Sequence, residues 1–435
     1  MIMSGKKAAF IKGTFILTMT GFISKIIGFF YRIFLSNKIG AEGMGIYQLI
    51  FPVIAICHAI TTCGITTAIS KLCAEKNAQN DADGAKTVLL SGLILSVALS
   101  IVTGIFLILS ADFLSLHIYN ETRCSLLFKI TALSLPFCAV HSCICGYYYG
   151  AKQTMIPAAS QLVEQFIRVC SVIIICHILE SKNTPVGIYI AVIGIVLGET
   201  ASMLFSLTAL TFNSPNNFFR RTEKMCFSPI ISLSLPLSFN RLSLHLLQSV
   251  EAVLLPLTLV ASGLTNKEAL SVYGTLTGMA LPFILFPSAI TNSIATLLLP
   301  TIAEARAAGN KRLINSAIYK SFILSICFGF CLTAVFLILG DFLGEFFFHS
   351  TLVGHFIKTL AFICPFLCLG ITFESILNGL GKTGTSFIHN IAGLILRICF
   401  VWFAVPKAGI TGYLWGILAC EMLISLLHCY SLRKT

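Results

Sequence analysis

Long apolar blocks follow one another along the chain, separated by short polar segments, and within a block apolar and polar positions do not alternate. The blocks hold about 20 residues or more, the length that an α-helix needs to cross the hydrocarbon core of a bilayer. Because lipid offers the backbone no hydrogen-bond partners, a spanning segment must be a helix or part of a closed barrel, and barrel strands would alternate. The pattern therefore predicts an all-α polytopic membrane protein.

Twelve membrane-spanning helices are expected. The predicted spans are 12–36, 45–71, 87–111, 124–149, 154–179, 186–211, 229–256, 268–299, 316–340, 356–378, 385–405 and 409–430. Lys6, Lys7 and Lys12 precede the first apolar stretch, as in a secretory signal, but no small-residue cleavage site follows it. We therefore expect this stretch to be retained as the first membrane helix.

An internal repeat divides the predicted helices into two sets of six. At a shift of 229 positions the chain matches Gly45 with Gly274, Thr62 with Thr291, Pro136 with Pro365, Gly150 with Gly379 and Arg168 with Arg397, and a shift of 222 matches Glu199 with Glu421. Six helices per half give both halves the same orientation, a parallel repeat common among secondary transporters. We predict an N-terminal six-helix lobe over 1–212, a cytoplasmic inter-lobe linker over 213–228 and a C-terminal six-helix lobe over 229–435.

Composition agrees with a membrane protein and argues against a soluble enzyme. Hydrophobic residues make up 57% of the chain and charged residues 11%, whereas a soluble domain carries roughly 25% charged residues. The 17 cysteines form no C-x-x-C motif and lie mostly in apolar helices, so we interpret them as packing residues. No polar segment is long enough to hold a catalytic triad or a metal-ligand motif, so neither an enzymatic activity nor a cofactor or metal is expected.

One short motif superficially resembles a phosphate-binding loop. The run Gly379-Leu380-Gly381-Lys382-Thr383 lacks the glycine that the G-x-x-x-x-G-K-T spacing requires at Ile376, and no strand precedes it. Its counterpart in the repeat, 150–154, indicates a tight cytoplasmic turn between helices. Neither a nucleotide nor a nucleic acid is therefore expected as a partner.

The lysines and arginines of the predicted loops are distributed unevenly. With both termini on one side of the membrane, the loops of that side hold 17 of these residues and the opposite loops hold 6. Lys and Arg are enriched in cytoplasmic loops. We therefore expect a multi-pass protein of the cell membrane with both termini in the cytoplasm.

Ionisable residues inside the predicted spans are candidates for function, because charge is costly in lipid. The basic ones are Lys25, Arg32, Lys129, Arg168, Arg241 and Arg397, and the acidic ones are Glu164, Glu199, Glu251, Glu374 and Glu421.

Cations gather on one face of two of these helices. Lys25 and Arg32 share a face of the first span. Arg241, His245 and Gln248 share a face of the seventh, its equivalent in the repeat. If the two spans face each other, these residues line a central cavity suited to an anion, and the planar fork of arginine suits phosphate in particular. Alternatively, Lys25 and Arg32 reach the membrane interface or pair with glutamates, and His245 is a packing residue.

The other intramembrane charges are candidates for ion pairs or for ion coupling. Glu164 and Arg168 lie four apart on the fifth span, which favours an intrahelical pair. Arg397 lacks this partner, since Gly393 occupies the position equivalent to Glu164. We expect Glu374 or Glu421 to balance Arg397. Glu199 and Glu421 occupy equivalent positions and are expected to hold the fold together. Glu251 is the remaining candidate for an ion pair or for ion coupling.

The segments 24–32 (Ser-Lys-Ile-Ile-Gly-Phe-Phe-Tyr-Arg) and 40–48 (Gly-Ala-Glu-Gly-Met-Gly-Ile-Tyr-Gln) resemble the first helix and following loop of the stage V sporulation protein B group. This group belongs, with MurJ-like flippases, to the polysaccharide transporter branch of the multidrug/oligosaccharidyl-lipid/polysaccharide (MOP) exporter superfamily. The resemblance implies a MATE-like bundle of two six-helix lobes that exports a lipid-linked glycan precursor by alternating access. In MurJ-like members, cations of the first helix contact the pyrophosphate of the lipid carrier, and Lys25 and Arg32 match those positions.

The preferred function is therefore a flippase for undecaprenyl-pyrophosphate-linked peptidoglycan or polysaccharide precursors, with spore cortex formation as one setting. Its partners would be the anionic lipid-linked glycan, the bilayer and cell-wall synthesis proteins. A cation-coupled multidrug exporter of the same fold is a second hypothesis, but it would need a carboxylate on the first span, which has none. A third is a non-transporting scaffold for cell-wall assembly, which the intact repeat and the buried charges disfavour.

Overall fold

The computed structural model describes residues 2–213 and 225–433, with side chains described from Ile16 onward apart from Asn213. Within these residues the chain is helical and no strand occurs. The chain packs as two compact units. Unit 1 comprises Met1–Tyr31 and Leu49–Leu246, and unit 2 comprises Arg32–Gln48 and Leu247–Thr435.

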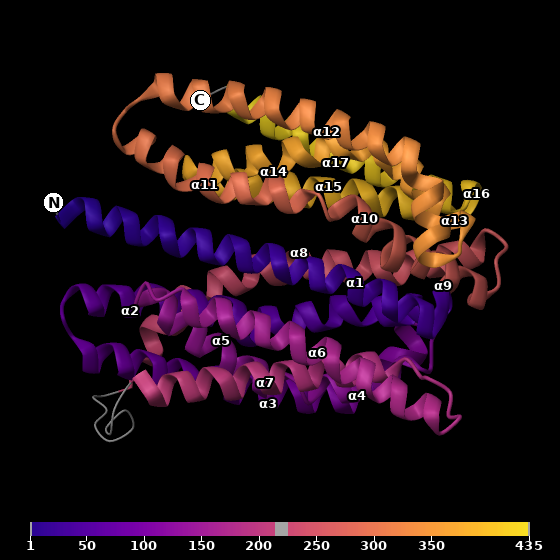
Figure 1. The fold of residues 1–435 in the computed structure, drawn as a ribbon, viewed down its shortest axis with the longest axis horizontal. Helices are drawn as coiled ribbons and strands as arrows, with labels where there is room; N and C mark the ends of the chain where they lie inside the picture. The colour runs from indigo at the N-terminus through magenta and orange to yellow at the C-terminus, as the bar shows by residue number, and fades with distance from the viewer. Residues whose placement is uncertain (1, 214–224, 434–435) are drawn as a thin grey trace. The chain divides into compact units, whose positions relative to one another are not determined.

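Figure 1 shows the order of the helices along the chain. The first half contains α1 (Ile2–His58), a π-helical turn (Ala59–Cys63), α2 (Gly64–Ala78), α3 (Ala82–Phe113), a second π-helical turn (Leu114–Ile118), α4 (Cys124–Ala132), α5 (Leu135–Gly150), α6 (Met155–Ser181) and α7 (Tyr189–Asn213). The second half contains α8 (Phe227–Ala261), α9 (Asn266–Gly274), a π-helical turn (Thr275–Ala280), α10 (Leu281–Leu285), α11 (Ser288–Ala307), α12 (Lys311–Phe348), α13 (Thr351–Leu360), a 3₁₀ turn (Ala361–Ile363), α14 (Cys364–Gly379), α15 (Thr383–Phe403), α16 (Val405–Ala408) and α17 (Ile410–Arg433).

The membrane-spanning character of the chain is confirmed. In the described residues, ten helices are long and apolar enough to cross a membrane, or eleven when the bent pair α4 and α5 is taken as one span. The first of these, Ile16–Ala78, has 63 residues, whereas one crossing needs about 20. It is broken at Gly40, whose φ of 71° lies in the left-handed region that glycine favours. Counted as two crossings, this segment brings the described spans to the predicted twelve.

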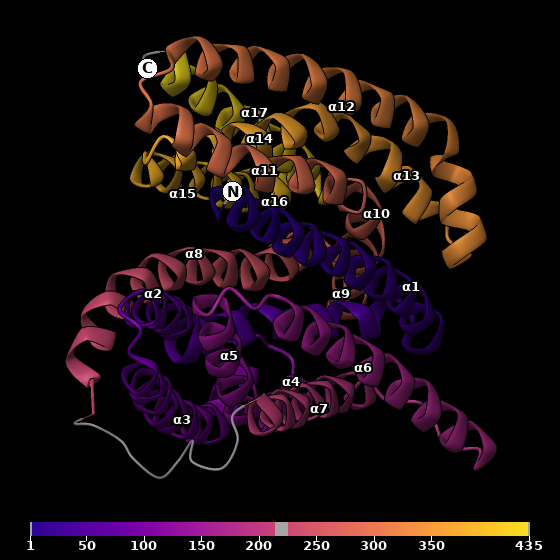
Figure 2. The same ribbon diagram turned by 60° about the vertical axis from the view of Figure 1, so that its left-hand side comes forward.

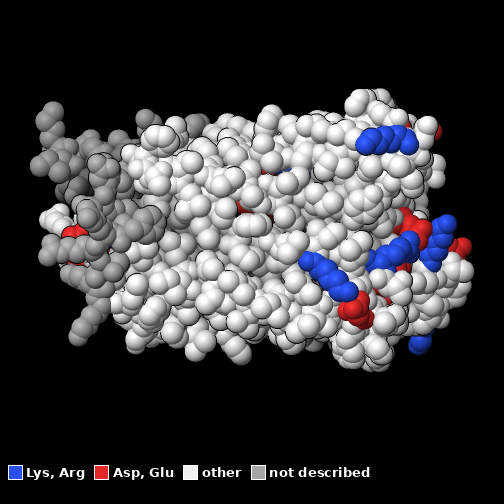
Figure 3. Space-filling view, turned by 90° about the horizontal axis from the view of Figure 1, so that it is seen from below, with Lys and Arg blue, Asp and Glu red and all other residues white. Residues whose placement is uncertain are grey.

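Apolar side chains cover the outer surface of the bundle. On α3, Val102, Phe106 and Leu109 are 65%, 69% and 78% exposed, which would be unfavourable in water but suits contact with lipid. Figure 3 shows a broad face almost free of charge, with Lys, Arg, Asp and Glu gathered toward one end of it. The face matches a hydrocarbon belt that ends at a polar interface.

The repeat seen in the sequence is present in the boundaries of the helices. Both α5 and α14 have 16 residues and a proline in the first turn, and their ends lie 229 positions apart. The caps repeat as well, because the side chain of Asp81 accepts a hydrogen bond from Gly84 N at the start of α3 and Asn310 accepts one from Leu313 N at the start of α12. The bounds of α5 and α14 and the N-caps of α3 and α12 are therefore repeated between the halves.

Equivalent helices also pack through equivalent residues. A Cβ on Gly150 would lie 2.6 Å from the Ser70 carbonyl oxygen, and a Cβ on Gly379 would lie 2.8 Å from the Leu299 carbonyl oxygen. Glycine at these two positions lets α5 approach α2, and α14 approach α11, closely enough for backbone contact. The crossing is thus repeated within each unit, 229 positions apart.

The units do not divide where the sequence predicted the linker. Residues 214–224 of the predicted linker 213–228 lie outside the described residues. The N-terminal part of α8 packs within unit 1, where Ile230 joins the core and Ser234 O would lie 2.3 Å from a Cβ on Gly64. The segment Arg32–Gln48 packs within unit 2 instead. The boundaries of the two packing units lie inside α1 and α8. The division into lobes over 1–212 and 229–435 stays a prediction.

Two predicted spans are interrupted. The span 124–149 bends by 44° between α4 and α5, where Pro136 in the first turn of α5 removes a backbone hydrogen-bond donor. The span 268–299 is divided into α9, a π-helical turn, α10 and α11. A break at 286–287 separates α10 from α11, and Pro287 is the N-cap residue of α11. Hydrophobicity continues through both interruptions, so the sequence pattern alone could not reveal them.

Candidate functional site

Unit 1 holds a cluster of titratable side chains within its membrane-spanning helices. It is formed by His58 from α1, His141 from α5, Glu164 and Arg168 from α6, and Glu199 from α7. The central helix is α5, which Figure 2 shows with α2, α3 and α7 around it. Glu199 is only 7% exposed. A charged group this deeply buried is costly in lipid unless it is compensated, so its partners matter.

The contacts inside this cluster link three helices. Glu164 accepts a hydrogen bond from the Arg168 guanidinium one turn away, as the spacing predicts. His141 Nε2 lies at hydrogen-bond distance, 3.0 Å, from Ser160 Oγ on α6. On its other side, His141 Nδ1 lies 3.8 Å from Glu199 Oε2, a pair that attracts by charge only when the imidazole is protonated. Among the described residues, Glu199 Oε2 has no hydrogen-bond partner.

Glycines on α7 bring these charges together. A Cβ on Gly198 would lie 2.9 Å from the Glu164 carbonyl oxygen, and a Cβ on Gly194 would lie 2.4 Å from a methyl group of Val172. The absence of a side chain at these positions lets α7 lie directly against α6. Glu199, next to Gly198, is therefore held close to the Glu164–Arg168 pair.

The cluster carries more negative than positive fixed charge. With both histidines neutral, two carboxylates face one guanidinium. One donor atom from each of His141, Glu164 and Glu199 lies within 4.8 Å of the others. A proton on an imidazole or a small cation at this position would neutralise the excess charge, which is what a coupling site in a transporter requires.

Unit 2 contains a buried ion pair in which the partner of Arg397 differs from the predicted one. Arg397 on α15 pairs with Glu251 on α8, with Nη2 2.6 Å from Oε2 and Nε 2.5 Å from Oε1. The Tyr413 hydroxyl donates to Glu251 Oε1 at 2.7 Å. Glu251 is 5% exposed. One hydrogen bond from the guanidinium to Oε2 and one from Tyr413 to Oε1 satisfy both carboxylate oxygens, which allows Glu251 to be buried.

The predicted partners of Arg397 are thus wrong as direct partners. Glu374 accepts hydrogen bonds from Ser386 and Asn390 instead, at 3.2 and 3.1 Å. Glu421 lies within electrostatic reach of Arg397 but forms no ion pair with it in the described part of the chain. The acid comes from α8 because Gly393, which replaces the glutamate of the first half, packs against Ile424 on α17 and offers no carboxylate.

The intramembrane cations fall into two groups. Lys129 pairs with Asp112 at 2.9 Å, Arg168 pairs with Glu164, and Arg397 pairs with Glu251. Lys25, Arg32 and Arg241 form no ion pair with an acid of their own unit among the described residues. Lys25 and Arg241 are exposed in unit 1, and Arg32 is partly buried in unit 2. These three cations are among the five residues that the sequence assigned to substrate binding.

The remaining predicted binding residues have less distinct surroundings. His245 is half-buried in α8 and within electrostatic reach of His58, so it borders the unit 1 cluster. Gln248 is exposed and belongs to unit 2. That His245 and Gln248 join Lys25, Arg32 and Arg241 in one cavity stays a prediction.

Sequence reasoning missed His141 and Tyr413. Each interacts with a buried glutamate, His141 with Glu199 and Tyr413 with Glu251. A histidine in an apolar span is a signal that could have singled out His141. A tyrosine near a span end is common at membrane interfaces, so the residue type alone gave no reason to place Tyr413 beside an acid.

Known proteins share both the sequence pattern and the fold. The family model described as polysaccharide biosynthesis protein matches residues 10–306, and the MatE model matches residues 244–403. Stage V sporulation protein B of Bacillus subtilis (strain 168) is 28% identical over 98% of this chain and 84% of its own length. The lipid II flippase MurJ of the same organism is 22% identical over 89% of this chain and 76% of its own length.

A solved structure of a multidrug resistance MATE transporter, in an inward-facing conformation, has the same fold. Its TM-score is 0.76 at 16% identity, with 94% of each chain covered. The predicted fold class and resemblance are confirmed, and the chain is a membrane transporter rather than an enzyme. Because the family model matches residues 10–306, more than half of the chain, this chain belongs to the polysaccharide biosynthesis protein family.

Proposed function

We propose that this transporter is a flippase that exports an undecaprenyl-pyrophosphate-linked peptidoglycan or polysaccharide precursor by alternating access. The anionic headgroup would contact Lys25, Arg32 and Arg241, with His245 and Gln248 as further polar contacts. Spore cortex formation is the proposed setting, and cell-wall synthesis proteins are the proposed partners. The proposed location is the cell membrane with both termini in the cytoplasm, on the loop charges of 17 against 6.

The observation that carries this proposal is the division of the intramembrane cations. Lys129, Arg168 and Arg397 each have a carboxylate partner, whereas Lys25, Arg32 and Arg241 have none in their own unit in the described residues. A cation kept in a membrane span without a partner is expected to meet its counter-charge from a ligand. Two of the three are arginines, whose planar fork suits the oxygens of a pyrophosphate.

The relatives support the same class of cargo. One relative is named as a lipid II flippase and another as a stage V sporulation protein. Lipid II carries a pyrophosphate, so the charge of its headgroup is the one that Lys25, Arg32 and Arg241 would recognise.

The test is translocation of fluorescent lipid II in proteoliposomes. We expect the wild type to move the lipid and Lys25→Gln and Arg241→Gln to lower the rate at least 10-fold, since each removes a charge contact to the phosphates. Lys182→Gln is the matched control, because it removes an exposed lysine of unit 1 outside the spans. If wild type fails while folded, the cargo is another lipid-linked glycan. If Lys25→Gln and Arg241→Gln both transport like the control, the binding residues are wrong.

A cation-coupled multidrug exporter is the second candidate. It is favoured by the His141, Glu164 and Glu199 donor set, which suits a proton or a small cation. Ethidium efflux from vesicles separates the two functions. Efflux driven by a sodium or proton gradient, and lost in Glu199→Gln, would favour the exporter, whereas lipid II movement without efflux favours the flippase.

A further inference from the structure

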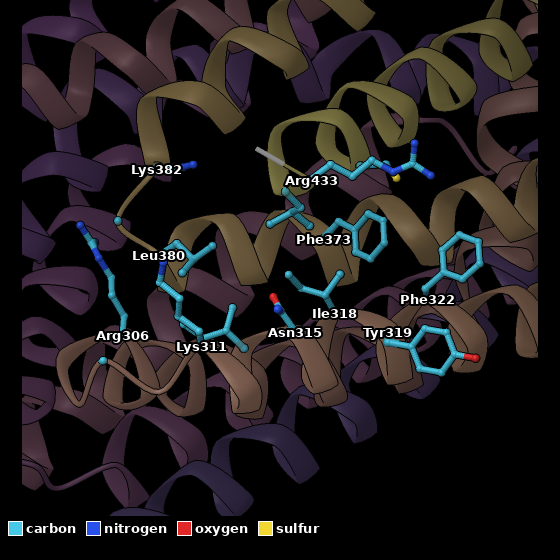
Figure 4. A pocket seen from close by; sticks show the side chains of 15 residues that line it. Arg306, Lys311, Asn315, Ile318, Tyr319, Phe322, Phe373, Leu380, Lys382 and Arg433 are labelled. Carbon is cyan, nitrogen blue, oxygen red and sulfur yellow. The ribbon is translucent and has the colours of Figure 1, made fainter. Parts of the chain in front are cut away.

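A pocket of about 940 Å³ opens in unit 2 at the end of the bundle that carries the C-terminus. Figure 4 shows how the end of α11, the start of α12, the turn between α14 and α15, and the end of α17 surround it. All four elements belong to unit 2. We propose that this pocket binds an anionic phospholipid of the adjacent leaflet, with its phosphate among the cations of the rim and an acyl chain along the apolar wall.

The rim of the pocket is strongly cationic. Arg306, Lys311, Lys382 and Arg433 line it, and among the described lining residues none is acidic. In the described part of the chain, Arg306, Lys311 and Arg433 form no ion pair. Arg306, Lys311 and Lys382 gather at one end of the pocket (Figure 4). Like charges repel each other, so an anion in their midst is favourable.

The turn after α14 holds one of these cations at the rim. Gly381 has a φ of 70°, and a Cβ there would lie 2.3 Å from Arg306 Nη1. Only a glycine lets the guanidinium lie over this turn. The turn thus places Lys382 at the same rim as Arg306.

The wall of the pocket is apolar and aromatic. Ile314 and Ile318 line it from α12, and the rings of Phe322 and Phe373 stack with centroids 6.4 Å apart. Figure 4 shows Lys311, Arg306 and Lys382 at one end of the pocket and Phe322 and Tyr319 at the other. A ligand that fits must therefore be anionic at one end and apolar along its length.

The pocket lies at the depth of the lipid headgroups. With 38 residues, α12 is about 57 Å long at 1.5 Å per residue, whereas the hydrocarbon core is only about 30 Å thick. Because Lys311 and Arg312 are exposed cations in the first turn of α12, we expect this end of the helix to extend beyond the hydrocarbon. Basic pockets between membrane helices at this depth are suited to anionic lipid headgroups.

The repeat shows that the fold does not require these cations. In unit 1, the positions equivalent to these four rim residues of unit 2 are uncharged. They are Asn77, Ala82, Gln153 and Thr211. The nearby Lys76 and Lys86 are paired with Asp81 and Asp83 at 2.8 and 3.3 Å, and Lys152 is a further cation of that corner. The same helix ends are thus built without a converging cationic rim.

A second pocket of unit 2 gives a contrast within the same molecule. It has about 610 Å³ and a mostly apolar lining that includes Phe330, Phe362 and Trp415. Its lysine, Lys358, is paired with Asp341. We expect that pocket to take apolar chains without regard to headgroup charge, and the pocket of Arg306 to select for a negative charge.

The test uses the purified full-length chain, titrated with phosphatidylglycerol or phosphatidylcholine and followed by native mass spectrometry. We expect wild type to bind one phosphatidylglycerol per chain roughly 10-fold more tightly than phosphatidylcholine. The double variant Arg306→Gln/Lys311→Gln should lose this preference. Its matched control is Arg312→Gln/Lys320→Gln, which removes two exposed cations of α12 that do not line the pocket. The control should keep the preference.

A second variant tests the wall without changing any charge. Ile318→Trp should fill the pocket and weaken phosphatidylglycerol binding, and because it keeps all four cations it remains informative if the double variant does not fold. Equal binding of the two lipids to wild type, equal effects of the two double variants, or full binding by Ile318→Trp would each overturn the proposal.

Undecaprenyl phosphate is the competing probe. If it displaces phosphatidylglycerol at lower concentration, the ligand is the lipid carrier and the phospholipid assignment is wrong.

Discussion

Gly45 and Gly274 stand 229 positions apart in the sequence and lie against each other in unit 2, where a Cβ on Gly274 would be 2.3 Å from Gly45 N. Three residues further along, the side-chain amide of Gln48 donates to the Thr277 carbonyl at 3.1 Å, again across 229 positions. Residues that are equivalent in the repeat are therefore direct neighbours. Two small residues let the two helix backbones touch.

We expect Gly45→Ala to destabilise the protein, because its Cβ would lie 2.1 Å from the Leu270 carbonyl oxygen. Overpacking of this kind typically costs about 1–3 kcal/mol. Thermal unfolding of the detergent-purified protein measures the effect. Gly370→Ala is the control, since no atom lies within 4 Å of its Cβ. Equal melting temperatures for the two variants would mean that the glycine contact is not tight.

Glu251→Gln should be among the most destabilising single changes in unit 2. It leaves the Arg397 guanidinium buried without a carboxylate, and breaking a buried pair costs about 3–5 kcal/mol. Tyr413→Phe removes one hydrogen bond to the same carboxylate and should cost about 1.5–3 kcal/mol. Thermal unfolding ranks the variants. Removing the charge of Arg397 as well, in Glu251→Gln/Arg397→Gln, should recover part of the loss, and a further loss would contradict a simple pair.

The sequence was sufficient for features that depend on local spacing or on the repeat. The Glu164–Arg168 pair follows from a spacing of four on one helix, and the matching ends of α5 and α14 follow from a constant offset. Lipid also constrains the backbone so strongly that apolar length alone identifies most spans. These features needed no knowledge of which helices are neighbours.

Tertiary packing decided what the sequence could not. Glu251 and Arg397 are 146 positions apart, and their pairing depends on which turns of α8 and α15 meet. The approach of His141 to Glu199 depends on Gly198, whose missing side chain reads in sequence as one more small residue of an apolar span. Whether Lys25, Arg32 and Arg241 share a cavity stays a prediction for the same reason.

The cap of α3 should make part of the stability depend on pH. The Lys76 ammonium and then the Gly84 backbone N–H hold the pKa of Asp81 below its ordinary value. Since the folded-state pKa is lowered, this stabilisation is present above the unfolded pKa of about 3.9 and is lost as pH falls through the folded value. Asp81→Ala should therefore melt below wild type at pH 7 and approach it near pH 3. Asn310→Ala, at the equivalent uncharged cap, should show the same deficit at both pH values.

The charge of the unit 1 cluster should depend on pH. Because His141 attracts Glu199 only when it is protonated, the stabilisation from this pair should be present at low pH and be lost as the imidazole deprotonates. In Glu199→Gln the remaining Glu164–Arg168 pair is neutral by itself, so the need for a proton disappears. We expect the difference in melting temperature between wild type and Glu199→Gln to change by about 2 °C or more between pH 7 and pH 10.5. The control is Glu421→Gln, which removes the equivalent acid of unit 2. The charges that act on Glu421 are those of Arg397 and Glu374. The difference in melting temperature between wild type and Glu421→Gln should therefore stay constant. A constant difference for Glu199→Gln as well would show that His141 does not change charge in this range, and would remove the cluster as a proton-coupling site.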